Sequence, residues 1–398
     1  MPQYLAPGVY VEEVPSSPPI AGVGTSTAAF IGVVNPAAKN PDGSGFSMPF
    51  KPGRPANPAN PRPDDRYELA AEGQMALVTN WDQFKTKFGD FHMANRALAH
   101  AVYGFFNNGG TTCYVTRVKD LADAAVAEAA LKKYEAIDEI ALVAAPGALS
   151  DAVQLKMIEH CETLEDRFAI IDGQETDSIG VDSIKGPIRK SDQAAIYFPR
   201  IVVFDPVSGA PLPVHPSGHV AGVYARVDQE RGVHKAPANE PVRGAVGLSY
   251  LVSRDEQQIL NPAGINVIRN LNGSILIWGA RTLGGDANGE TKYVNVRRLL
   301  NFLRESIDEG TQFAVFEPNA RPLWQRITRT VSAFLTNVWR DGALFGDTPE
   351  QAFYVRCDET TNPPDVRELG QVVTEIGVAI VRPAEFVIFR ISQMAGPA

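Results

Sequence analysis

The sequence predicts a mixed fold, with an α/β middle part built on a largely parallel sheet and an α+β part toward the C-terminal end. Between residues 76 and 205, short apolar runs alternate with helical patterns, which is typical of βαβ units. In the last third, an apolar strand and a glycine-rich turn precede two long amphipathic helical patterns. A chain of 398 residues exceeds one typical domain, so we expect two or three.

The first β-prone run, at residues 4–14, has no neighbour with which it could form a tight hairpin. Pro15, Pro18 and Pro19 separate it from the next predicted strand, residues 27–34. An extended segment with unpaired backbone groups either finds a sheet edge elsewhere or stays disordered. Its apolar side chains favour docking onto such an edge. The candidate docking residues are Tyr4, Val9, Tyr10, Val11 and Val14.

A proline-rich segment interrupts the regular patterning early in the chain. Residues 35–66 hold eight prolines with scattered Gly and Asn, so we expect a surface loop or linker that buries little. Regular patterns then resume. The expected strands are residues 76–78, 112–118, 140–144, 168–172 and 201–205. The expected helices run from a cap at Thr79 or Asn80 to Gly89, and over residues 97–106, 121–137 and 152–164.

The part of the chain from residue 206 onward begins with a Pro- and Gly-rich stretch, residues 206–240, which predicts a long irregular connection. An apolar strand at 274–280 follows, and then a helix with apolar residues at helical spacing: Val296, Leu299, Leu300, Leu303 and Ile307. A second helix is expected at 322–339, with an apolar side formed by Leu323, Trp324, Ile327, Val331, Phe334, Leu335 and Val338. The final apolar strand, 385–391, needs cover on both faces; it contains Phe386, Val387, Ile388, Phe389 and Ile391.

Composition excludes several classes of function. A net charge of -9, a pI near 5.3 and the lack of a Lys/Arg run argue against nucleic-acid binding. No window holds about 18 uninterrupted apolar residues, so we expect no membrane span. The first residues lack the pattern of a Sec signal peptide. Cys113, Cys161 and Cys357 are widely spaced, which predicts reduced, buried thiols and neither a zinc site nor a disulfide framework.

Positive charge toward the C-terminal end is carried almost entirely by arginine. From residue 260 onward there are 13 Arg and one Lys, Lys292, against 15 acidic residues. Arginine tolerates interfaces, because its planar guanidinium pairs bidentately with carboxylates and stacks on aromatic rings. Each of these arginines could equally belong to an ordinary solvated face.

Possible metal sites are weak. Asp172 ends a predicted strand, where open α/β sheets place ligands, and Asp177 and Asp182 could add carboxylates; strand-end Asp residues are also common turn formers. His215 and His219 have an HxxxH spacing, and His234 lies nearby, but this spacing presents one face only on a helix. Pro216 and Gly218 argue against a helix there. We therefore expect no metal and no cofactor.

Enzyme motifs are equally sparse. There is no GxSxG nucleophile elbow and no GxxxxGK[ST] phosphate loop. The GVGTS run at residues 22–26 resembles a dinucleotide fingerprint only in part, because Thr27 stands at the third glycine position and a strand follows. The sequence therefore favours a structural protein, with an α/β hydrolase as the alternative.

Several separated motifs together resemble the contractile-tail sheath family, the sheaths of contractile phage tails and of phage-tail-like injection particles. In order they are YLAPGVYVEEV, TSTAAFIG, VTNWDQFKTKFG, YGFFNNGGTTCYVTRV, HPSGHVAGVYARVDQERGVHKAPANE, WGARTL, YVNVRRL, FEPN, GALFG, AFYVRCD and IGVAIVRPAEFVIFRI. The resemblance covers nearly the whole chain. The proline-rich segment 35–66 departs from it and looks like an insertion.

The resemblance implies a domain arrangement. Residues 1–20 would be an N-terminal arm and 21–254 an outer α/β domain that is similar in layout to subtilisin without its proteolytic chemistry. Residues 255–384 would be a C-terminal core domain facing the tube, and 385–398 a C-terminal arm. The terminal strands would be swapped between subunits.

The resemblance also implies a mechanism and partners. Both arms would be added as strands to neighbouring subunits, giving stacked hexameric rings in a helical tube. The other partners would be an inner tube protein, baseplate proteins and a tail terminator, with no nucleic acid and no direct membrane insertion. Candidate residues for pairing with tube carboxylates are Arg297, Arg298, Arg326 and Arg329. Such particles are made in the bacterial cytoplasm.

Overall fold

The structure is a computed structural model that describes residues 19–53, 62, 65–175, 179–186 and 188–388. The chain divides into two compact units. The large unit comprises Val23–Glu305 and Ile380–Ala398, and the small unit comprises Met1–Gly22 and Ser306–Ala379. The boundary after Glu305 falls inside helix α8 (Val294–Thr311), so this helix begins in the large unit and ends in the small one.

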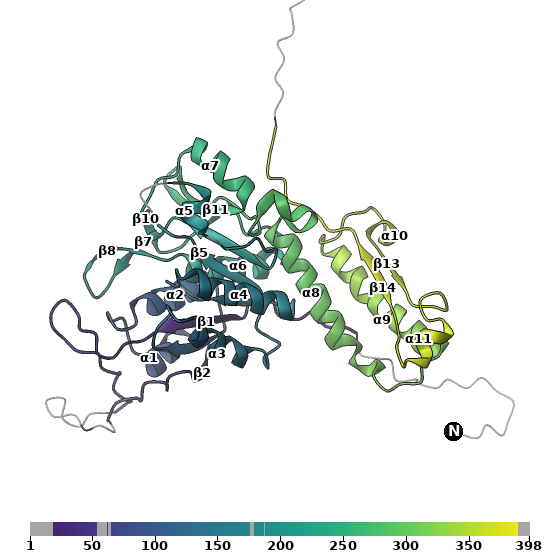
Figure 1. Ribbon diagram of the computed structural model, residues 1–398, viewed down its shortest axis with the longest axis horizontal. Helices are drawn as coiled ribbons and strands as arrows, with labels where there is room; N and C mark the ends of the chain where they lie inside the picture. Colours follow the sequence, from purple (N-terminus) through teal and green to yellow (C-terminus); the bar gives the residue numbers. More distant parts are fainter. Residues whose placement is uncertain (1–18, 54–61, 63–64, 176–178, 187, 389–398) are drawn as a thin grey trace, which may run out of the picture. The chain divides into compact units, whose positions relative to one another are not determined.

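Within the described residues, a nine-stranded sheet forms the centre of the large unit, in the order β2-β3-β1-β4-β5-β6-β11-β12-β9 (Figure 1). In this order, the six neighbouring strands that begin with β3 and end with β11 are parallel to one another. At one end β2 pairs antiparallel with β3, and at the other end β12 pairs antiparallel with β11 and β9 with β12. The strands are β1 Ala28–Val33, β2 Met75–Val78, β3 Cys113–Val118, β4 Leu142–Ala144, β5 Phe168–Asp172, β6 Ala194–Phe198, β9 Glu240–Pro241, β11 Ile265–Leu271 and β12 Ser274–Ile277. The predicted parallel sheet is confirmed.

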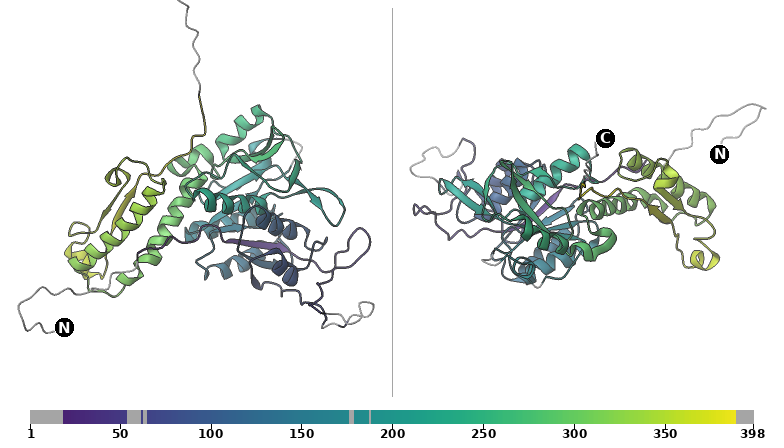
Figure 2. Two further views of the ribbon diagram at one scale, coloured as in Figure 1. Left: turned by 180° about the vertical axis from the view of Figure 1, so that it is seen from behind. Right: turned by 90° about the horizontal axis from the view of Figure 1, so that it is seen from above.

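Helices cover both faces of this sheet, because alternate residues of each strand point to opposite sides. In β1, Phe30 packs with Leu98 and Phe105 of α2 in one core, and Ile31 packs with Leu131 of α3 and Ile158 of α4 in the other. Figure 2 shows two further views of the ribbon, with helices on both faces of the sheet. The helices of the large unit are α1 Trp81–Phe88, α2 Arg96–Asn107, α3 Ala124–Tyr134, α4 Asp151–Leu164, α5 Val181–Lys185, α6 Ser217–Arg231 and α7 Arg254–Leu260, with the 3-10 turns η2 Asn261–Ala263 and η3 Gly285–Thr291.

Helix α6 lies where the sequence analysis predicted an irregular connection, and that prediction was wrong. Pro216 stands just before the helix, where its missing N–H group leaves no helical hydrogen bond unmade. Gly218 and Gly222 do not break the helix; they allow it to approach α2 closely. A Cβ atom on either glycine would lie 2.4 Å from a backbone carbonyl oxygen of α2, that of Ala101 or that of Phe105.

Two further parts of the large unit differ from expectation. The predicted strand at 201–205 forms as β7 (Ile201–Asp205), but it joins a separate sheet in the order β10-β7-β8, with β8 Ala210–Val214 and β10 Ala245–Leu248. The unpredicted β6 takes the expected place in the main sheet. The proline-rich segment buries more than predicted, because Met48 is buried and Phe46 packs against the core beside Gly89.

The predicted domain boundary between residues 254 and 255 falls within the large unit. Strand β6 pairs in parallel with β11, from Ile265↔Ile196 to Val267↔Phe198. The main sheet therefore continues across this position, and the compact unit extends to Glu305.

The small unit is built on one long helix and a two-stranded sheet. The predicted helix at 322–339 is confirmed as α9 (Arg321–Arg340), and all seven residues of its predicted apolar side are buried. Strands β13 (Phe353–Arg356) and β14 (Glu375–Val378) pair antiparallel. The remaining elements are the 3-10 turn η4 Gln312–Ala314 and the helices α10 Pro349–Ala352 and α11 Pro364–Glu368.

Candidate assembly surfaces

The sheet of the small unit has two open edges. Within the described residues, β13 and β14 pair only with each other, from Phe353↔Val378 to Arg356↔Glu375. Each strand therefore presents one row of backbone N–H and C=O groups to a further strand. Such edges are templates for strand addition, in which backbone hydrogen bonds attach an extended segment.

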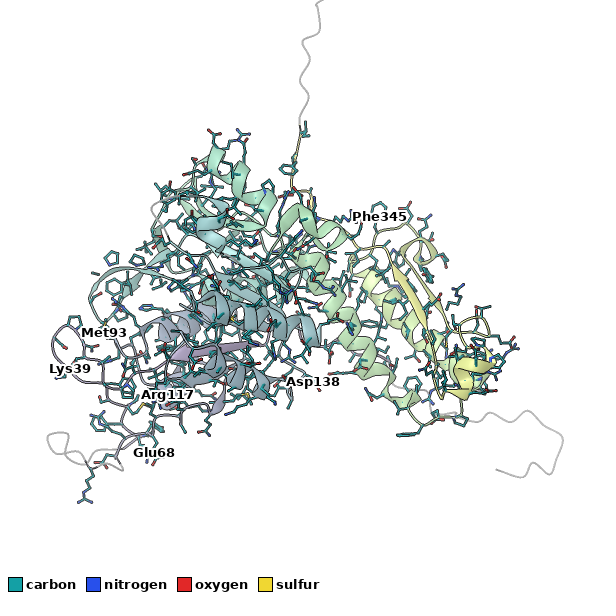
Figure 3. The ribbon with its side chains drawn as sticks, viewed as in Figure 1. Lys39, Glu68, Met93, Arg117, Asp138 and Phe345 are labelled. Atoms are coloured by element: carbon teal, nitrogen blue, oxygen red, sulfur yellow. The ribbon has the colours of Figure 1, made fainter. Side chains whose placement is uncertain are left out.

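The small unit also exposes large apolar side chains. Phe316 is fully exposed and has a positive φ of 64°, a conformation that costs a non-glycine residue free energy. Phe345, labelled in Figure 3, is 74% exposed, and its backbone N–H donates to the Ala379 carbonyl. Other exposed apolar residues of this unit are Val315, Tyr354, Leu369 and Val373. Apolar exposure of this kind is typical of surfaces that are covered in an assembly.

The bases of the two arms contact different units. On the N-terminal side, Ile20 is buried in the small unit and lies against Gly310, where an added Cβ atom would meet its Cγ1 at 2.5 Å. On the C-terminal side, residues 380–388 belong to the large unit. Phe386, Val387 and Ile388 are 71%, 69% and 76% exposed and lie in no strand. The predicted docking residues Tyr4, Val9, Tyr10, Val11, Val14, Phe389 and Ile391 lie outside the described residues.

The four predicted tube-facing arginines are divided between the two compact units. Arg297 and Arg298 belong to the large unit, and Arg326 and Arg329 to the small unit. Arg297 pairs with Asp192 at 3.4 Å. On α9, Arg326 lies over the Phe313 ring at 4.2 Å, while Arg329 is exposed.

Arg298 is buried within its own subunit, which corrects its assignment to a tube-facing surface. Its guanidinium donates to both oxygens of Asp228, at 3.0 and 2.5 Å, and to the Thr25 carbonyl at 2.8 Å. It also lies over the Tyr224 ring at 4.7 Å. Burial alone would lower the pKa of Arg298, but Asp228 outweighs it and the pKa is raised. This arginine stabilises the interior and is not available to a partner.

Asp172 has a structural role instead of a ligand-binding one. Its carboxylate accepts from the Ser217 N–H and hydroxyl groups, both at 2.9 Å, and from the Gly147 N–H at 3.2 Å, so it caps the N-terminus of α6. The buried Ser217 hydroxyl donates to this carboxylate and to no imidazole among the described residues, which is not the arrangement of an activated nucleophile.

Candidate metal residues do not assemble into a site. His219 is buried inside α6, and His215 precedes this helix. The sequence argument that excluded a helix here was therefore wrong. Whether the described residues could hold a metal depends instead on the groups that the fold brings together. Among the described residues, no group of three His, Cys, Asp or Glu side chains could hold a metal ion, and Asp177 lies outside them. All three cysteines are free and buried, as expected, and burial raises the pKa of the Cys113 and Cys161 thiols.

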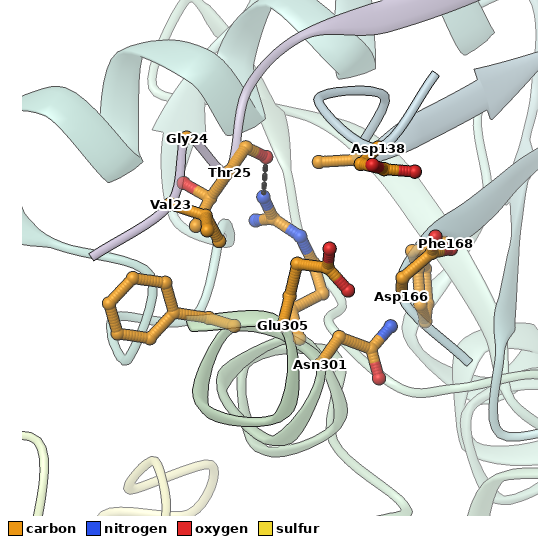
Figure 4. A pocket seen from close by; sticks show the side chains of 11 residues that line it. Val23, Gly24, Thr25, Asp138, Asp166, Phe168, Asn301 and Glu305 are labelled. Atoms are coloured by element: carbon orange, nitrogen blue, oxygen red, sulfur yellow. Dashed lines mark hydrogen bonds between the residues drawn. The ribbon is translucent and has the colours of Figure 1, made fainter. Parts of the chain in front are cut away.

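A pocket in the large unit lies beside the Arg298 pair (Figure 4). Thr25 lies on one side and Asn301 and Glu305 of α8 on another, with Asp138 and Asp166 opposite. The dashed line in Figure 4 is the bond from Arg298 to the Thr25 carbonyl. The lining holds no Ser, Cys, His or Lys, and the Thr25 hydroxyl donates at 2.7 Å to the Asp228 carboxylate, which also binds Arg298. Of the helices in the described residues, none combines the length and apolar character required to cross a membrane.

Comparisons with known proteins identify the family. Residues 122–283 match the phage tail sheath protein central domain, and residues 286–394 match the phage tail sheath C-terminal domain. A putative prophage major tail sheath protein of Pseudomonas aeruginosa is 29% identical over 258 residues, 63% of this chain and 64% of that protein. The tail sheath protein of Vibrio phage KVP40 is 28% identical over 44% of this chain and 25% of its own length. The chain thus matches less than two thirds of the length of these curated relatives.

Solved structures match over nearly the whole chain. The sheath complex of an extracellular contractile injection system, PVC, in the contracted state has a TM-score of 0.76 and 28% identity, covering 99% of both chains. A chain from the baseplate of the anti-feeding prophage has a TM-score of 0.74 and 29% identity, covering 98% of this chain and 100% of that one. A sheath tail protein from Desulfitobacterium hafniense, with 10% identity and a TM-score of 0.60, shares the fold.

The α/β fold and the open edges of β13 and β14 together are those of a structural protein that can add strands to its sheet. The chain belongs to the contractile tail sheath family. It is a structural subunit of a contractile sheath and not an enzyme, and the hydrolase alternative is not supported.

Proposed function

We propose that this chain polymerises into a helical sheath around an inner tube and that the sheath shortens to drive the tube through a target envelope. Its partners would be copies of itself in stacked hexameric rings, the inner tube protein, baseplate proteins and a terminator protein. The similar chains from a contracted sheath and from a baseplate support this assignment. The particle would be a phage tail or a phage-tail-like injection system, assembled in the bacterial cytoplasm.

The attachment between copies is strand addition, and the observation that supports it is the pair of open edges on β13 and β14. An arm from one neighbour would pair with each edge, with backbone hydrogen bonds for affinity and alternate side chains for register. The same contact repeated with one rotation and rise gives an open helical tube. The arms would stay paired while the bodies rotate, and no nucleotide would be consumed, because the energy is stored at assembly.

Deleting residues 1–14 tests the arm hypothesis. We expect a soluble subunit with the circular dichroism spectrum of the full chain that forms no tubes by electron microscopy, because the Ile20 attachment and both compact units are kept. Deleting residues 389–398 should have the same effect. Tubes of normal length from either truncated chain would contradict strand addition by that arm.

Reversing the positive charge on α9, at the partly buried Arg326 and the exposed Arg329, tests the inner tube as a partner. The double substitution Arg326→Glu and Arg329→Glu should weaken tube-templated assembly, and more strongly at low salt, because exposed charges are screened over about 10 Å at 0.1 M salt. Arg297→Glu, on the large unit, serves as the comparison. Sedimentation of sheath with preformed tube measures the effect, and unchanged loading would remove α9 from the proposed tube-facing surface.

A further inference from the structure

The base of the C-terminal arm is attached by one carboxylate, Glu385. Its Oε1 atom accepts from Arg281 Nε at 2.9 Å and from Asn261 Nδ2 at 2.7 Å. Its Oε2 atom accepts from Arg281 Nη2 at 2.8 Å and from the Tyr293 hydroxyl at 2.9 Å. Each oxygen therefore has two donors, one of them from a bidentate guanidinium, which is the strongest geometry for a carboxylate in proteins.

The donors are themselves fixed by the main sheet of the large unit. The backbone N–H of Arg281 donates to Asn266 Oδ1, and Asn266 Nδ2 donates to the Arg281 carbonyl, both at 2.7 Å. Asn266 is fully buried in β11. Nη1 of Arg281 contacts the Asn261 carbonyl at 3.2 Å and the Asp286 carboxylate at 3.0 Å, and the Arg281 side chain is only 4% exposed. The carboxylate is thus bound by groups with little freedom to move.

The chain around Glu385 is held by side chains. Among the described residues of 380–388, the side-chain hydrogen bonds and ion pairs are those of Glu385 and an exposed ion pair between Arg382 and Glu290. Directly after this attachment, in which the Glu385 side chain is 20% exposed, come three apolar residues that the isolated subunit leaves exposed: Phe386, Val387 and Ile388. A fixed, polar attachment followed by an uncovered apolar run is the arrangement of a tether whose far end binds elsewhere.

We propose that Asn261, Arg281 and Tyr293 form an anchoring site for Glu385 that fixes the exit of the C-terminal arm and passes tension on that arm to the nine-stranded sheet. This inference rests on the proposed function, and it adds which residues connect arm and body. Fixing the exit raises the local concentration of the arm at a neighbour's open edge, because less conformational freedom is lost when it binds. Tension along the arm reaches β11 and β12 through Arg281 and Asn266. Glu385 is thus a positioning residue for assembly.

The experiment compares Glu385→Ala and the milder Glu385→Gln with the intact chain. A matched control is Asp228→Asn, which disturbs another buried, bidentate arginine–carboxylate pair of the same unit, remote in sequence from the arm. A spin label on Val387→Cys reports the freedom of the arm, since the three native cysteines are buried. Tube formation is followed by sedimentation and electron microscopy.

We expect severalfold faster label motion in Glu385→Ala, a smaller change in Glu385→Gln and none in Asp228→Asn. The protein concentration needed for tube growth should rise about tenfold in Glu385→Ala. Unchanged label motion, or normal assembly, in a folded Glu385→Ala protein would overturn the anchoring role; if that variant does not fold, Glu385→Gln decides by the same two readouts. If Glu385→Ala assembles normally but the chain without residues 389–398 does not, only the anchoring role is wrong. If both variants assemble normally, strand addition by this arm is wrong as well.

Discussion

The two compact units differ in how far one chain completes them. In the large unit, helices cover both faces of the sheet, and charged groups such as Arg298 and Asp228 satisfy each other inside it. In the small unit, a helix packs on one side of two strands whose outer edges meet no described strand, and aromatic residues stay exposed. The large unit is therefore specified by contacts within one subunit, whereas the small unit leaves surfaces that we propose are covered by other subunits.

Two glycines, Gly222 in the large unit and Gly377 in the small unit, test this difference in packing most directly. A Cβ atom on Gly222 of α6 would lie 2.4 Å from the Phe105 carbonyl oxygen, a backbone atom that cannot move aside. A Cβ atom on Gly377 of β14 would meet ring carbons of Tyr354 at 2.1 to 2.8 Å, but that ring is 59% exposed and can rotate away.

Gly222→Ala should therefore lower the free energy of unfolding by about 3 kcal/mol or more, because a backbone oxygen cannot give way to the new methyl group. The gain in helix propensity from Gly to Ala, about 1 kcal/mol, has the opposite sign and is too small to compensate. Gly377→Ala should change stability by about 0.5 kcal/mol or less. Urea unfolding followed by circular dichroism measures both. Equal stability of the two variants would show that the large unit is not the more tightly packed one.

Acid should destabilise the large unit more than the small one. All six histidines lie between residues 92 and 234, and none lies in 306–379. Burial lowers the pKa of His219 to about 3, and burial together with nearby Arg167 lowers the pKa of His160 to about 4. Because the folded-state pKa values are depressed, the stabilisation is complete above the unfolded value near 6.5 and is lost as the pH falls.

When the pH falls from 7.5 to 5, each of these two histidines should lower the free energy of unfolding of the large unit by about 2 kcal/mol. His160→Gln should remove the part of this pH-dependent loss of stability that comes from His160, while keeping a similar side-chain volume. Hydrogen exchange of peptides from each unit at both pH values is the measurement. Equal acid sensitivity in peptides from 306–379 would contradict the assignment to buried histidines.

Elements whose apolar residues recur at regular spacing were predicted correctly from the sequence. Features that depend on contacts between residues far apart in the chain were missed. The apolar side of α9 was correct because residues at helical spacing share one environment. Helix α6 was missed because Pro216 and Gly218 look like helix breakers until the helix is known to begin after Pro216 and α2 is known to lie against Gly218. Arg298 was placed on the surface because buried arginines are rare without a partner, and its partner, Asp228, lies 70 residues away.

The assembly surfaces were predictable only in part. The exposure of Phe386, Val387 and Ile388 agrees with an apolar run that lacks cover in its own subunit. The Glu385 site had no local signal, since its donors Asn261, Arg281 and Tyr293 precede it by 124, 104 and 92 residues. No spacing rule connects residues that a fold alone brings together.

The base of the N-terminal arm offers a more local test, because Ile20 lies against Gly310 of the small unit. Ile20→Ala should destabilise this attachment by about 2 kcal/mol, because a buried side chain is truncated. Gly310→Ala should also destabilise it, since the new methyl group would lie 2.5 Å from Ile20 Cγ1. In the double variant the added methyl group occupies part of the space that Ile20 vacates, so the two losses should not add.

A double-mutant cycle on urea unfolding should therefore give a coupling free energy of about 1 kcal/mol or more, larger than the value expected for residues that do not touch. Hydrogen exchange at residues 19–25 would locate the effect at the arm base. Label motion at Val387→Cys should remain unchanged in all three variants, because that arm is attached to the large unit through Glu385. If Ile20→Ala instead freed the C-terminal arm, the two arms would share one attachment, and the contrast between an apolar base on the small unit and an ionic base on the large unit would be lost.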